Sequence, residues 1–211
     1  MMTFFHSPGS CSNGILFLLH EVGAAFECVV VDLRKGEQTQ AAYRALNPKG
    51  KVPALRLSEG SVLTEFQAIA TWLTAAHPEA GLQPANELAR SRVIEALDFI
   101  IGSVHMRGFT FVKVPAKFHD SPEAQTAIRA HGRKEVTKGL SLLSEHLGEQ
   151  DYLLGEFSAA DAGLLYVLTW AEEEGFGLPR NLDACLARLR ARPAYAAAEP
   201  MLRHQTVAST Q

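Results

Sequence analysis

The chain has 211 residues, of which 47% are hydrophobic and 20% are charged, and its formal net charge is −3. These fractions exclude global disorder and are typical of a globular protein with one large domain or two small ones. A slightly acidic chain is a poor candidate for nucleic-acid binding, because contacts to phosphates need a basic surface. No apolar run approaches the roughly 20 residues of a membrane span. The N-terminus lacks the basic region that opens a signal peptide, so we expect neither a leader nor a membrane partner.

The three cysteines, Cys11, Cys28 and Cys185, form no disulfide pattern, because their number is odd, their spacing is wide and no CxxC occurs. This usage favours a reducing, cytoplasmic location. The eight histidines form no metal-ligand cluster with the cysteines, so we expect no metal. The motifs GxGxxG, GxxxxGK[ST], GxSxG and HExxH are absent, which removes the nucleotide, esterase and zinc-protease functions that they indicate.

The first eighty residues predict a small α/β domain in the order strand, helix, strand, helix, strand, strand, helix. The expected strands cover residues 2–6, 26–31, 52–57 and 61–63, and the second of them is expected to be buried. The expected helices cover residues 15–22, 40–46 and 65–76. A segment with two prolines and a glycine, residues 77–86, follows and is typical of a linker.

Beyond the linker the strand signals vanish and apolar residues recur at helical spacing. The expected helices cover residues 94–104, 136–147, 161–170, 182–190 and 193–202. Residues 161–170 are apolar on nearly every face, which predicts the central, buried helix of an all-helical domain. The predicted fold is therefore an α/β domain followed by an all-α domain.

Cys11 is the most informative residue, because it lies between a Ser-Pro-Gly-Ser turn and a helix. A thiol at a helix N-terminus meets the positive end of the helix dipole, which lowers its pKa and favours the reactive thiolate. A lone cysteine is also often a small buried apolar residue, and the position alone leaves both interpretations open. Cys28 lies in a β-branched run and Cys185 on a helical stripe, so we expect both in the core.

Two further features concern the backbone at Val52-Pro53 and the carboxylate of Glu65. Locally, Pro53 predicts an ordinary trans proline at the start of an edge strand, since only about 5–6% of X–Pro bonds are cis. A cis bond would instead present the backbone of Val52 to an extended, peptide-like ligand. Glu65 starts a helix, where the positive end of the helix dipole stabilises its carboxylate. The alternative role of Glu65 is to pair with the ammonium group of a ligand, while the N–H groups at the helix start bind a ligand carboxylate.

Asp98, Gly102 and His105 have the spacing of one α-helical face, distinct from the apolar stripe. Such a face is usually only solvated, and the alternative is that His105 transfers protons or donates a hydrogen bond in a cleft. Ser158 and Asp161 form a capping box before the apolar helix, for which we expect a folding role.

Together these motifs resemble the cytosolic glutathione transferases, most closely the bacterial beta class, over essentially the whole chain. Residues 7–12 resemble the cysteine loop, 47–55 the cis-proline segment, 63–69 the start of the γ-glutamyl-binding helix and 157–161 the second domain's capping box. The resemblance implies a thioredoxin-like glutathione-binding domain (1–79) and an all-helical domain with the electrophile site (87–211). It also implies a homodimeric, cytoplasmic enzyme of detoxification that uses glutathione as co-substrate and small hydrophobic electrophiles as substrates.

The resemblance also implies roles for individual residues. Cys11 and His105 are expected beside the glutathione sulfur as the catalytic pair. Val52 is expected to pair with the cysteinyl backbone and Glu65 to face the γ-glutamyl end. The full set implied for glutathione binding is Cys11, Lys35, Lys51, Val52, Pro53, Glu65, Phe66, Asp98, Gly102, Ser103 and His105. Phe109 and Phe111 are implied for the wall of the electrophile site, and no metal is implied.

The chain departs from the beta-class pattern at three places. Phe66 replaces a small residue, His6 stands where tyrosine is frequent, and Ser103 stands where glutamate is frequent, with one extra residue after His105. The leading hypothesis is conjugation of glutathione to an electrophile. The alternatives are monothiol disulfide exchange through Cys11, and a non-catalytic ligand-binding or dimerisation module of the same fold.

Overall fold

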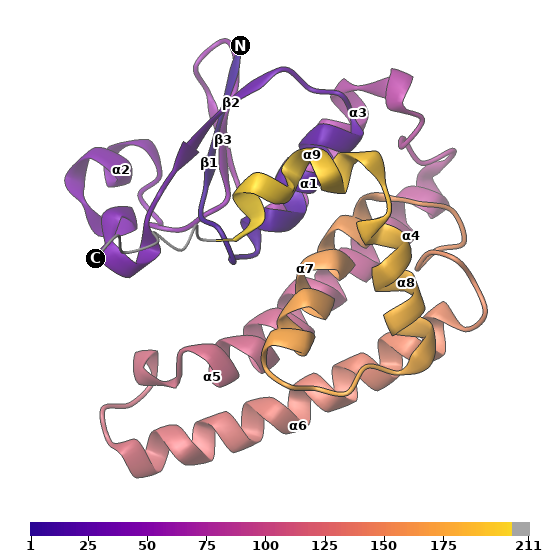
Figure 1. The fold of residues 1–211 in the computed structure, drawn as a ribbon. Helices are drawn as coiled ribbons and strands as arrows, with labels where there is room; N and C mark the ends of the chain where they lie inside the picture. The colour runs from indigo at the N-terminus through magenta and orange to yellow at the C-terminus, as the bar shows by residue number, and fades with distance from the viewer. Residues whose placement is uncertain (204–211) are drawn as a thin grey trace, which may run out of the picture. The chain divides into compact units, whose positions relative to one another are not determined.

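The computed structural model describes residues 1–203 of the chain (Figure 1). Its internal contacts divide the chain into two units. The first comprises Met1–Gly81 together with the C-terminal segment from Ala191, and the second comprises Leu82–Arg190. Within the described residues, no helix combines the length and the apolar character needed to cross a membrane.

The first unit is built on a four-stranded sheet in the order β2-β1-β3-β4. Its strands are β1 (Met2–His6), β2 (Phe26–Val30), β3 (Ala54–Arg56) and β4 (Val62–Thr64). β1 runs parallel to β2 and antiparallel to β3, and β3 runs antiparallel to β4. The parallel pair needs a crossover connection, which α1 (Ser12–Glu21) supplies.

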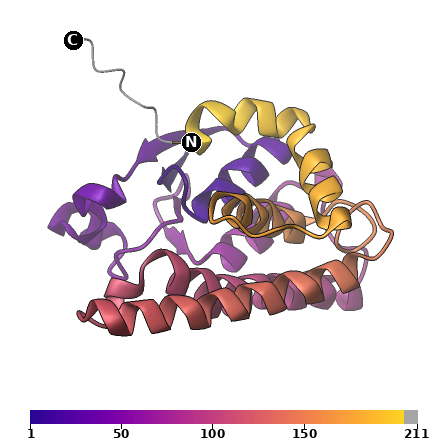
Figure 2. The same cartoon turned by 60° about the horizontal axis from the view of Figure 1, so that its bottom comes forward.

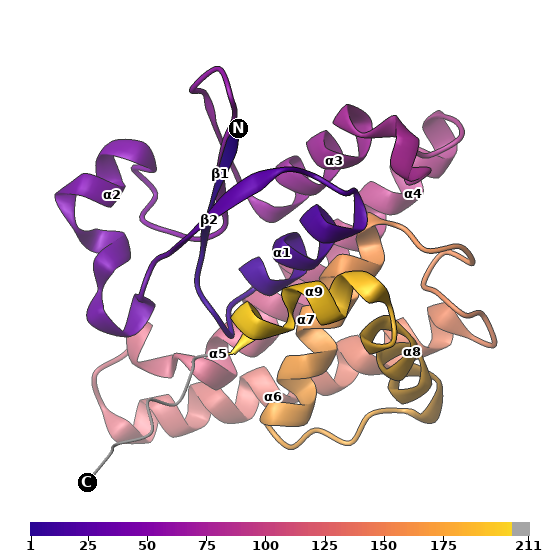
Figure 3. The ribbon, with the colours of Figure 1, turned by 45° about the horizontal axis from the view of Figure 1, so that its top comes forward.

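Helices cover both faces of this sheet (Figures 1 and 3). Side chains alternate along β1, so Phe5 packs with Tyr43 of α2 (Ala41–Leu46) on one face, while Phe4 and His6 face the other. α1 packs against α3 (Phe66–Ala76). Three short 3₁₀ turns complete the connections: η1 (Leu33–Lys35), η2 (Glu37–Thr39) and η3 (Pro78–Ala80). The predicted α/β pattern of the first domain is confirmed.

β2 differs from its prediction as a buried strand. It is an edge strand, because only β1 pairs with it, and three of its residues are half-buried while two are exposed. Cys28 is accordingly half-buried, so its expected place in the core is wrong, whereas Cys185 is buried as predicted.

The last helix, α9 (Pro193–Leu202), packs on α1 and belongs by its contacts to the first unit. The sequence had assigned it to a helical domain of residues 87–211, because helical periodicity carries no information about which unit a helix packs on. Residues 204–211 of that range lie outside the described residues.

The second unit contains helices, with two isolated β-bridges between residues 152 and 156. Its elements are α4 (Glu87–Asp98), η4 (Phe99–Phe109), α5 (Thr110–Lys113), η5 (Pro115–Lys117), α6 (Pro122–Leu147), α7 (Ala159–Glu173) and α8 (Arg180–Arg190). α7 is buried along most of its length, as its apolar sequence predicts. The Ser158–Asp161 capping box is also confirmed, with the Ser158 N–H donating to Asp161 Oδ2 at 2.9 Å.

The continuation of α4, η4, is a π-helix of 11 residues. Its i→i+5 hydrogen bonds enclose one more residue per ring than an α-helix, and π segments are usually single turns that occur at functional sites. α6 lies alongside η4 and α5 (Figure 2), and Gly139 allows close approach, since a Cβ there would lie 2.8 Å from Val104 Cγ2.

Candidate functional site

The cysteine loop joins β1 to α1 and is held by side-chain hydroxyls. Cys11 is the N-cap of α1, and the hydroxyls of its neighbours Ser10 and Ser12 lie 2.6 Å apart. Ser12 Oγ also lies 2.7 Å from Nδ1 of the buried His6. The Cys11 thiol donates to the backbone carbonyl of Val52 at 3.6 Å. The two segments that the sequence predicted to flank the glutathione sulfur therefore meet at this thiol.

Of the two interpretations that the sequence leaves open for Cys11, a thiol with a lowered pKa or a buried neutral thiol, the structure favours the second. Burial, with a smaller contribution from the negative charge of Glu65, raises the pKa of this thiol to about 12. Backbone N–H groups at the helix start and the Lys51 ammonium act in the opposite direction without compensating. Desolvation penalises the charged form more than the helix N-terminus favours it, so Cys11 is a neutral thiol at neutral pH.

The Val52–Pro53 peptide bond is cis. The expectation of a trans bond from the local sequence is therefore wrong, and the bond agrees with the resemblance. The preceding residue is held from two sides, because Tyr43 OH and Asn47 Nδ2 donate to the carbonyl of Lys51 at 2.7 and 2.8 Å. Val52 thus presents its carbonyl to Cys11 from a fixed segment.

Glu65 precedes α3 with a φ of 71°, the one positive φ among the described non-glycine residues. Such backbone conformations concentrate at functional sites. Its carboxylate accepts a hydrogen bond from Lys49 Nζ at 2.6 Å, and the same ammonium donates to Thr64 Oγ1 at 2.8 Å. The sequence prediction missed Lys49, which lies in the Asn-Pro-Lys-Gly turn; its ammonium pairs with Oε1 of the carboxylate for which the sequence proposed a ligand ammonium as counter-ion.

The other predicted residues of the first unit take different positions. Phe66 is the first residue of α3 and is buried, with 4% of its surface exposed. Its ring therefore belongs to the core, and only its backbone can serve a ligand at the start of the helix. Lys51 is close enough to Cys11 for its charge to lower the pKa of the thiol. Lys35 lies on η1 with an exposed side chain, 3.8 Å from the carboxylate of Asp32.

In the second unit, His105 of η4 contacts an aromatic cluster on α7. Its Nδ1 lies 3.3 Å from Tyr166 OH, and its ring packs edge-on against Trp170 with 4.9 Å between the centroids. Lys113 Nζ lies 5.2 Å from the centroid of the Trp170 ring. The sequence prediction missed Tyr166 and Trp170, although two large aromatic residues with polar tips stand out in an otherwise aliphatic helix.

The two phenylalanines predicted for the electrophile site lie in different surroundings. Phe109 is fully buried and packs against Trp170, with 5.5 Å between the ring centroids, so it is a core residue that supports the aromatic cluster. Phe111 packs against Phe118 instead, 4.7 Å between centroids, and lies beside His131 of α6.

The predicted common face of Asp98, Gly102 and His105 is wrong. Asp98, Gly102 and Met106 are exposed, whereas His105 is half-buried against α7. The spacing of the prediction assumed about 3.6 residues per turn. The wider π-winding of η4 aligns residues four apart and turns His105 away from the other two. Ser103 is half-buried on the same segment.

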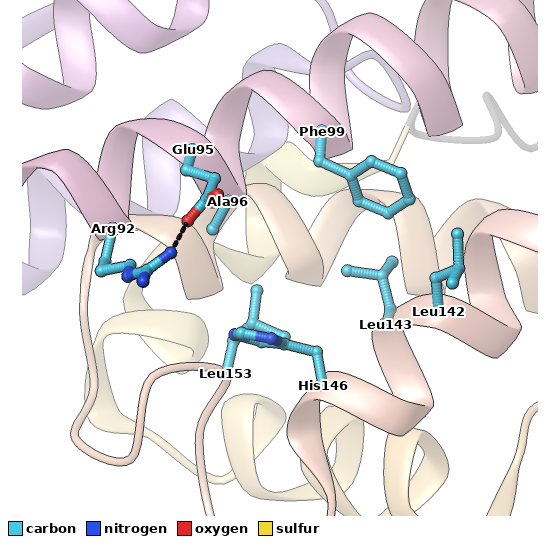
Figure 4. A pocket seen from close by; sticks show the side chains of 8 residues that line it. All are labelled: Arg92, Glu95, Ala96, Phe99, Leu142, Leu143, His146 and Leu153. Carbon is cyan, nitrogen blue, oxygen red and sulfur yellow. Dashed lines mark hydrogen bonds and ion pairs between the residues drawn. The ribbon is translucent and has the colours of Figure 1, made fainter.

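One cavity of the second unit, about 340 Å³, lies between α4 and α6 (Figure 4). Phe99, Leu142 and Leu143 supply apolar lining, and Arg92 lies at one end with its guanidinium 2.6 Å from the Glu95 carboxylate. None of the predicted glutathione or electrophile residues lines it. Among residues 1–203 no group of histidine, cysteine, aspartate and glutamate has the arrangement of a metal site.

Comparison with known proteins gives two matching family models. "Glutathione S-transferase, N-terminal domain" matches residues 9–76, and "Glutathione S-transferase, C-terminal domain" matches residues 126–198. The glutathione S-transferase GstA of Escherichia coli O157:H7 is 36% identical over 198 residues, which are 91% of this chain and 94% of that protein.

Two solved structures show the same fold over nearly the whole chain. A glutathione transferase homolog from Sulfitobacter with bound glutathione has a TM-score of 0.88 at 27% identity, covering 95% of this chain and 97% of that one. A beta-class glutathione S-transferase from Sphingomonas chungbukensis has a TM-score of 0.81 at 35% identity, covering 93% and 96%. The predicted fold class is thereby confirmed, and the chain belongs to the glutathione S-transferase family.

Proposed function

We propose that the protein is a glutathione transferase that binds glutathione on the first unit and conjugates it to small hydrophobic electrophiles. The observation that carries this proposal is the contact of the Cys11 thiol with the Val52 carbonyl, with the Glu65 carboxylate near enough for its charge to act on the thiol. Glutathione is an extended peptide whose central cysteinyl unit can pair with the Val52 backbone. Its γ-glutamyl ammonium suits Glu65, and the γ-glutamyl carboxylate suits the N–H groups at the start of α3.

The conjugation step needs an activated sulfur and a positioned partner. The glutathione thiol loses its proton to solvent, and the thiolate forms a carbon–sulfur bond with the electrophile. The leaving group departs with the electron pair of the bond that breaks. A hydrogen-bond donor at the sulfur lowers its pKa, and binding both partners supplies proximity. Cys11, which now donates its S–H to Val52, is the donor that we assign to the glutathione sulfur.

Disulfide exchange through Cys11 is the less favoured alternative. Exchange requires the Cys11 thiolate to attack a disulfide sulfur. With a pKa of about 12, about one molecule in 10⁵ carries that thiolate at pH 7. A non-catalytic module is also less favoured, because such a module does not need the Cys11 thiol, the Val52 carbonyl and the Glu65 carboxylate in one binding site.

For the electrophile we propose apolar contacts from the cluster around His105, Tyr166 and Trp170. Of the three, His105 is half-buried and offers its imidazole to a ligand, while Tyr166 and Trp170 are buried and support that ring with an apolar surface, which suits an apolar molecule with one polar substituent. Asp98, Gly102 and Ser103 remain proposed glutathione contacts. Detoxification of such electrophiles is the proposed biological role.

We also propose a homodimer in a cytoplasmic setting. The cavity between α4 and α6 (Figure 4) supports the homodimer, because the apolar side chain of Leu142 in its lining is 42% exposed. A second copy of the chain would cover this side chain. All three cysteines are free thiols, which suits a reducing compartment.

The test is titration calorimetry with glutathione, followed by assays with an aryl halide and with a mixed disulfide of glutathione. The wild type is expected to bind glutathione and conjugate the aryl halide, and Cys11→Ala to lose about tenfold in conjugation, the equivalent of one hydrogen bond. Cys11→Ser, which keeps a donor, is the matched control. Absence of glutathione binding by the wild type would refute the enzymatic proposal.

A further inference from the structure

The end of α9 is fastened to the cysteine loop by three hydrogen bonds from residues far apart in the sequence. His6 Nε2 lies 2.9 Å from the carbonyl of Met201. The Gly9 N–H and Asn13 Nδ2 both donate to the carbonyl of Leu202 at 2.9 Å. The last carbonyls of a helix have no partner inside the helix. The loop around Cys11 therefore satisfies them, and α9 in turn fixes the loop.

His6 differs from the other two residues that bind α9, because its second ring nitrogen contacts the hydroxyl of Ser12, the residue after the thiol. A carbonyl only accepts, so the bond to Met201 assigns the proton of neutral His6 to Nε2 and leaves Nδ1 as an acceptor. Ser12 Oγ lies 2.7 Å from Nδ1 and donates to it. Ser12 in turn accepts from the Ser7 N–H at 3.0 Å and from the Ser10 hydroxyl at 2.6 Å.

The hydrogen bonds thus run in one direction from the loop to the helix end: Ser10 to Ser12, Ser12 to His6, and His6 to Met201. Ser12 also lies 3.2 Å from the Ser7 carbonyl, which can take its proton when His6 no longer accepts it. Loss of the His6 acceptor would therefore reorient the Ser12 hydroxyl, and the Ser10 hydroxyl with it. His6 and Ser12 are both fully buried, so water does not replace the lost partner.

We propose that His6 is a positioning residue, which orients the hydroxyl pair on either side of Cys11 and so holds the thiol in register with Val52. The kinetic part of this proposal rests on the proposed glutathione transferase activity. The effect of His6 reaches the reacting sulfur through Ser12, Ser10 and the Cys11 backbone. His6 itself makes no contact with the ligand in this scheme.

The two contacts of His6 can be separated by a matched pair of amides. An asparagine amide reaches about as far as Nδ1, and a glutamine amide about as far as Nε2. His6→Asn should keep the bond to Ser12 and lose the one to Met201, whereas His6→Gln should do the reverse. Asn13→Ala removes a tie to α9 without touching the hydroxyls and controls for stability.

Three quantities are measured for each variant: the melting temperature, the KM and kcat with glutathione, and the rate of Cys11 alkylation by iodoacetamide without glutathione. All three variants are expected to melt at lower temperature. His6→Gln is expected to change the KM for glutathione and the alkylation rate about five- to tenfold, while His6→Asn and Asn13→Ala stay within about twofold.

Equal kinetic changes in His6→Asn and His6→Gln, or lower melting temperatures with unchanged kinetics, would overturn the proposal and leave His6 a purely structural tie. Should His6→Gln fail to fold, Ser10→Ala tests the same hydroxyl pair and is expected to shift the alkylation rate by a similar factor; no shift would contradict the proposal. If the wild type does not bind glutathione, the proposed function fails, while the alkylation rates still decide the role of His6.

Discussion

The reactivity of Cys11 toward an alkylating agent gives the sharpest test of how the site works. Burial raises the pKa of this thiol from its ordinary 9.0 to about 12. At pH 8 an ordinary cysteine is about one-tenth thiolate, and a thiol of pKa 12 is about one part in 10⁴ thiolate. Because only the thiolate reacts, we expect alkylation of Cys11 to be about a thousandfold slower than that of an ordinary cysteine.

The rate is measured with iodoacetamide between pH 7 and 10, with mass spectrometry of the peptide that contains Cys11. It should rise about tenfold per pH unit across this range without a plateau, since the thiolate fraction grows tenfold per unit below the pKa. Cys28, whose pKa burial raises to about 11, is an internal reference that should react faster. The Cys11→Ala variant gives the background.

A plateau between pH 7 and 9 would refute this reasoning. It would mean that the helix N-terminus and Lys51 outweigh desolvation, and that Cys11 is a thiolate at neutral pH. Disulfide exchange would then become the favoured activity, because the nucleophile that it needs would be present.

Three further predictions concern stability and binding. Asp161 accepts from the buried N–H of Leu153 and the partly buried N–H of Ser158, so Asp161→Asn should lower the free energy of unfolding in urea by about 2–4 kcal/mol. The exposed Asp183→Asn is the control and should change it by no more than about 0.5 kcal/mol. Since burial raises the pKa of Asp161 from 3.8 to about 6, the folded state favours its protonated form; wild-type stability should fall as the pH rises through this window, and the variant should lose that slope. Gly139→Ala places a Cβ 2.8 Å from a valine methyl of η4 and should cost about 1–3 kcal/mol, whereas Gly102→Ala, with no atom within 4 Å, should not destabilise. Glu65→Gln should raise the KM for glutathione about tenfold at unchanged kcat, because it weakens a charge-assisted contact made equally in ground and transition states.

Each of these has an outcome that contradicts it. A similar urea midpoint for Asp161→Asn and Asp183→Asn would mean that the capping box contributes little. An unchanged stability of Gly139→Ala would mean that α6 and η4 can separate without cost. A fall in kcat at constant KM for Glu65→Gln would place Glu65 in the chemical step instead of in binding.

Local patterns predicted much of the fold. The strand of residues 2–6 and the helix of residues 193–202 have the predicted bounds, and most of the others shift by up to three residues. The exceptions are α6, which begins at Pro122 instead of residue 136, and α4, which covers Glu87–Asp98 instead of residues 94–104. The capping box follows from two residues three positions apart, because its hydrogen bonds close within one helical turn. The motifs around Cys11, Val52 and Glu65 also indicated the family, since each is a short run of chain.

The features that the sequence left undecided depend on neighbours distant along the chain. The cis bond before Pro53 is held among segments that only the folded sheet brings together, and the local sequence favoured trans. The π-winding of η4, which Gly139 of α6 approaches closely, is not encoded in the spacing of the apolar residues, so a count at α-helical spacing misplaced His105. Lys49 meets Glu65 from a turn sixteen residues away.

Cys11 shows which properties of a residue follow from the sequence and which follow from the tertiary structure. The sequence alone determined that a thiol stands at the start of a helix, directly after a proline-containing turn, because adjacency in the chain dictates it. Only the tertiary structure decided its protonation, since the desolvation that raises its pKa comes from everything packed around it. The same holds for His6, whose partners lie 6 and 195 residues away. Local chemistry follows from order along the chain, whereas burial and long-range hydrogen bonds follow from packing in space.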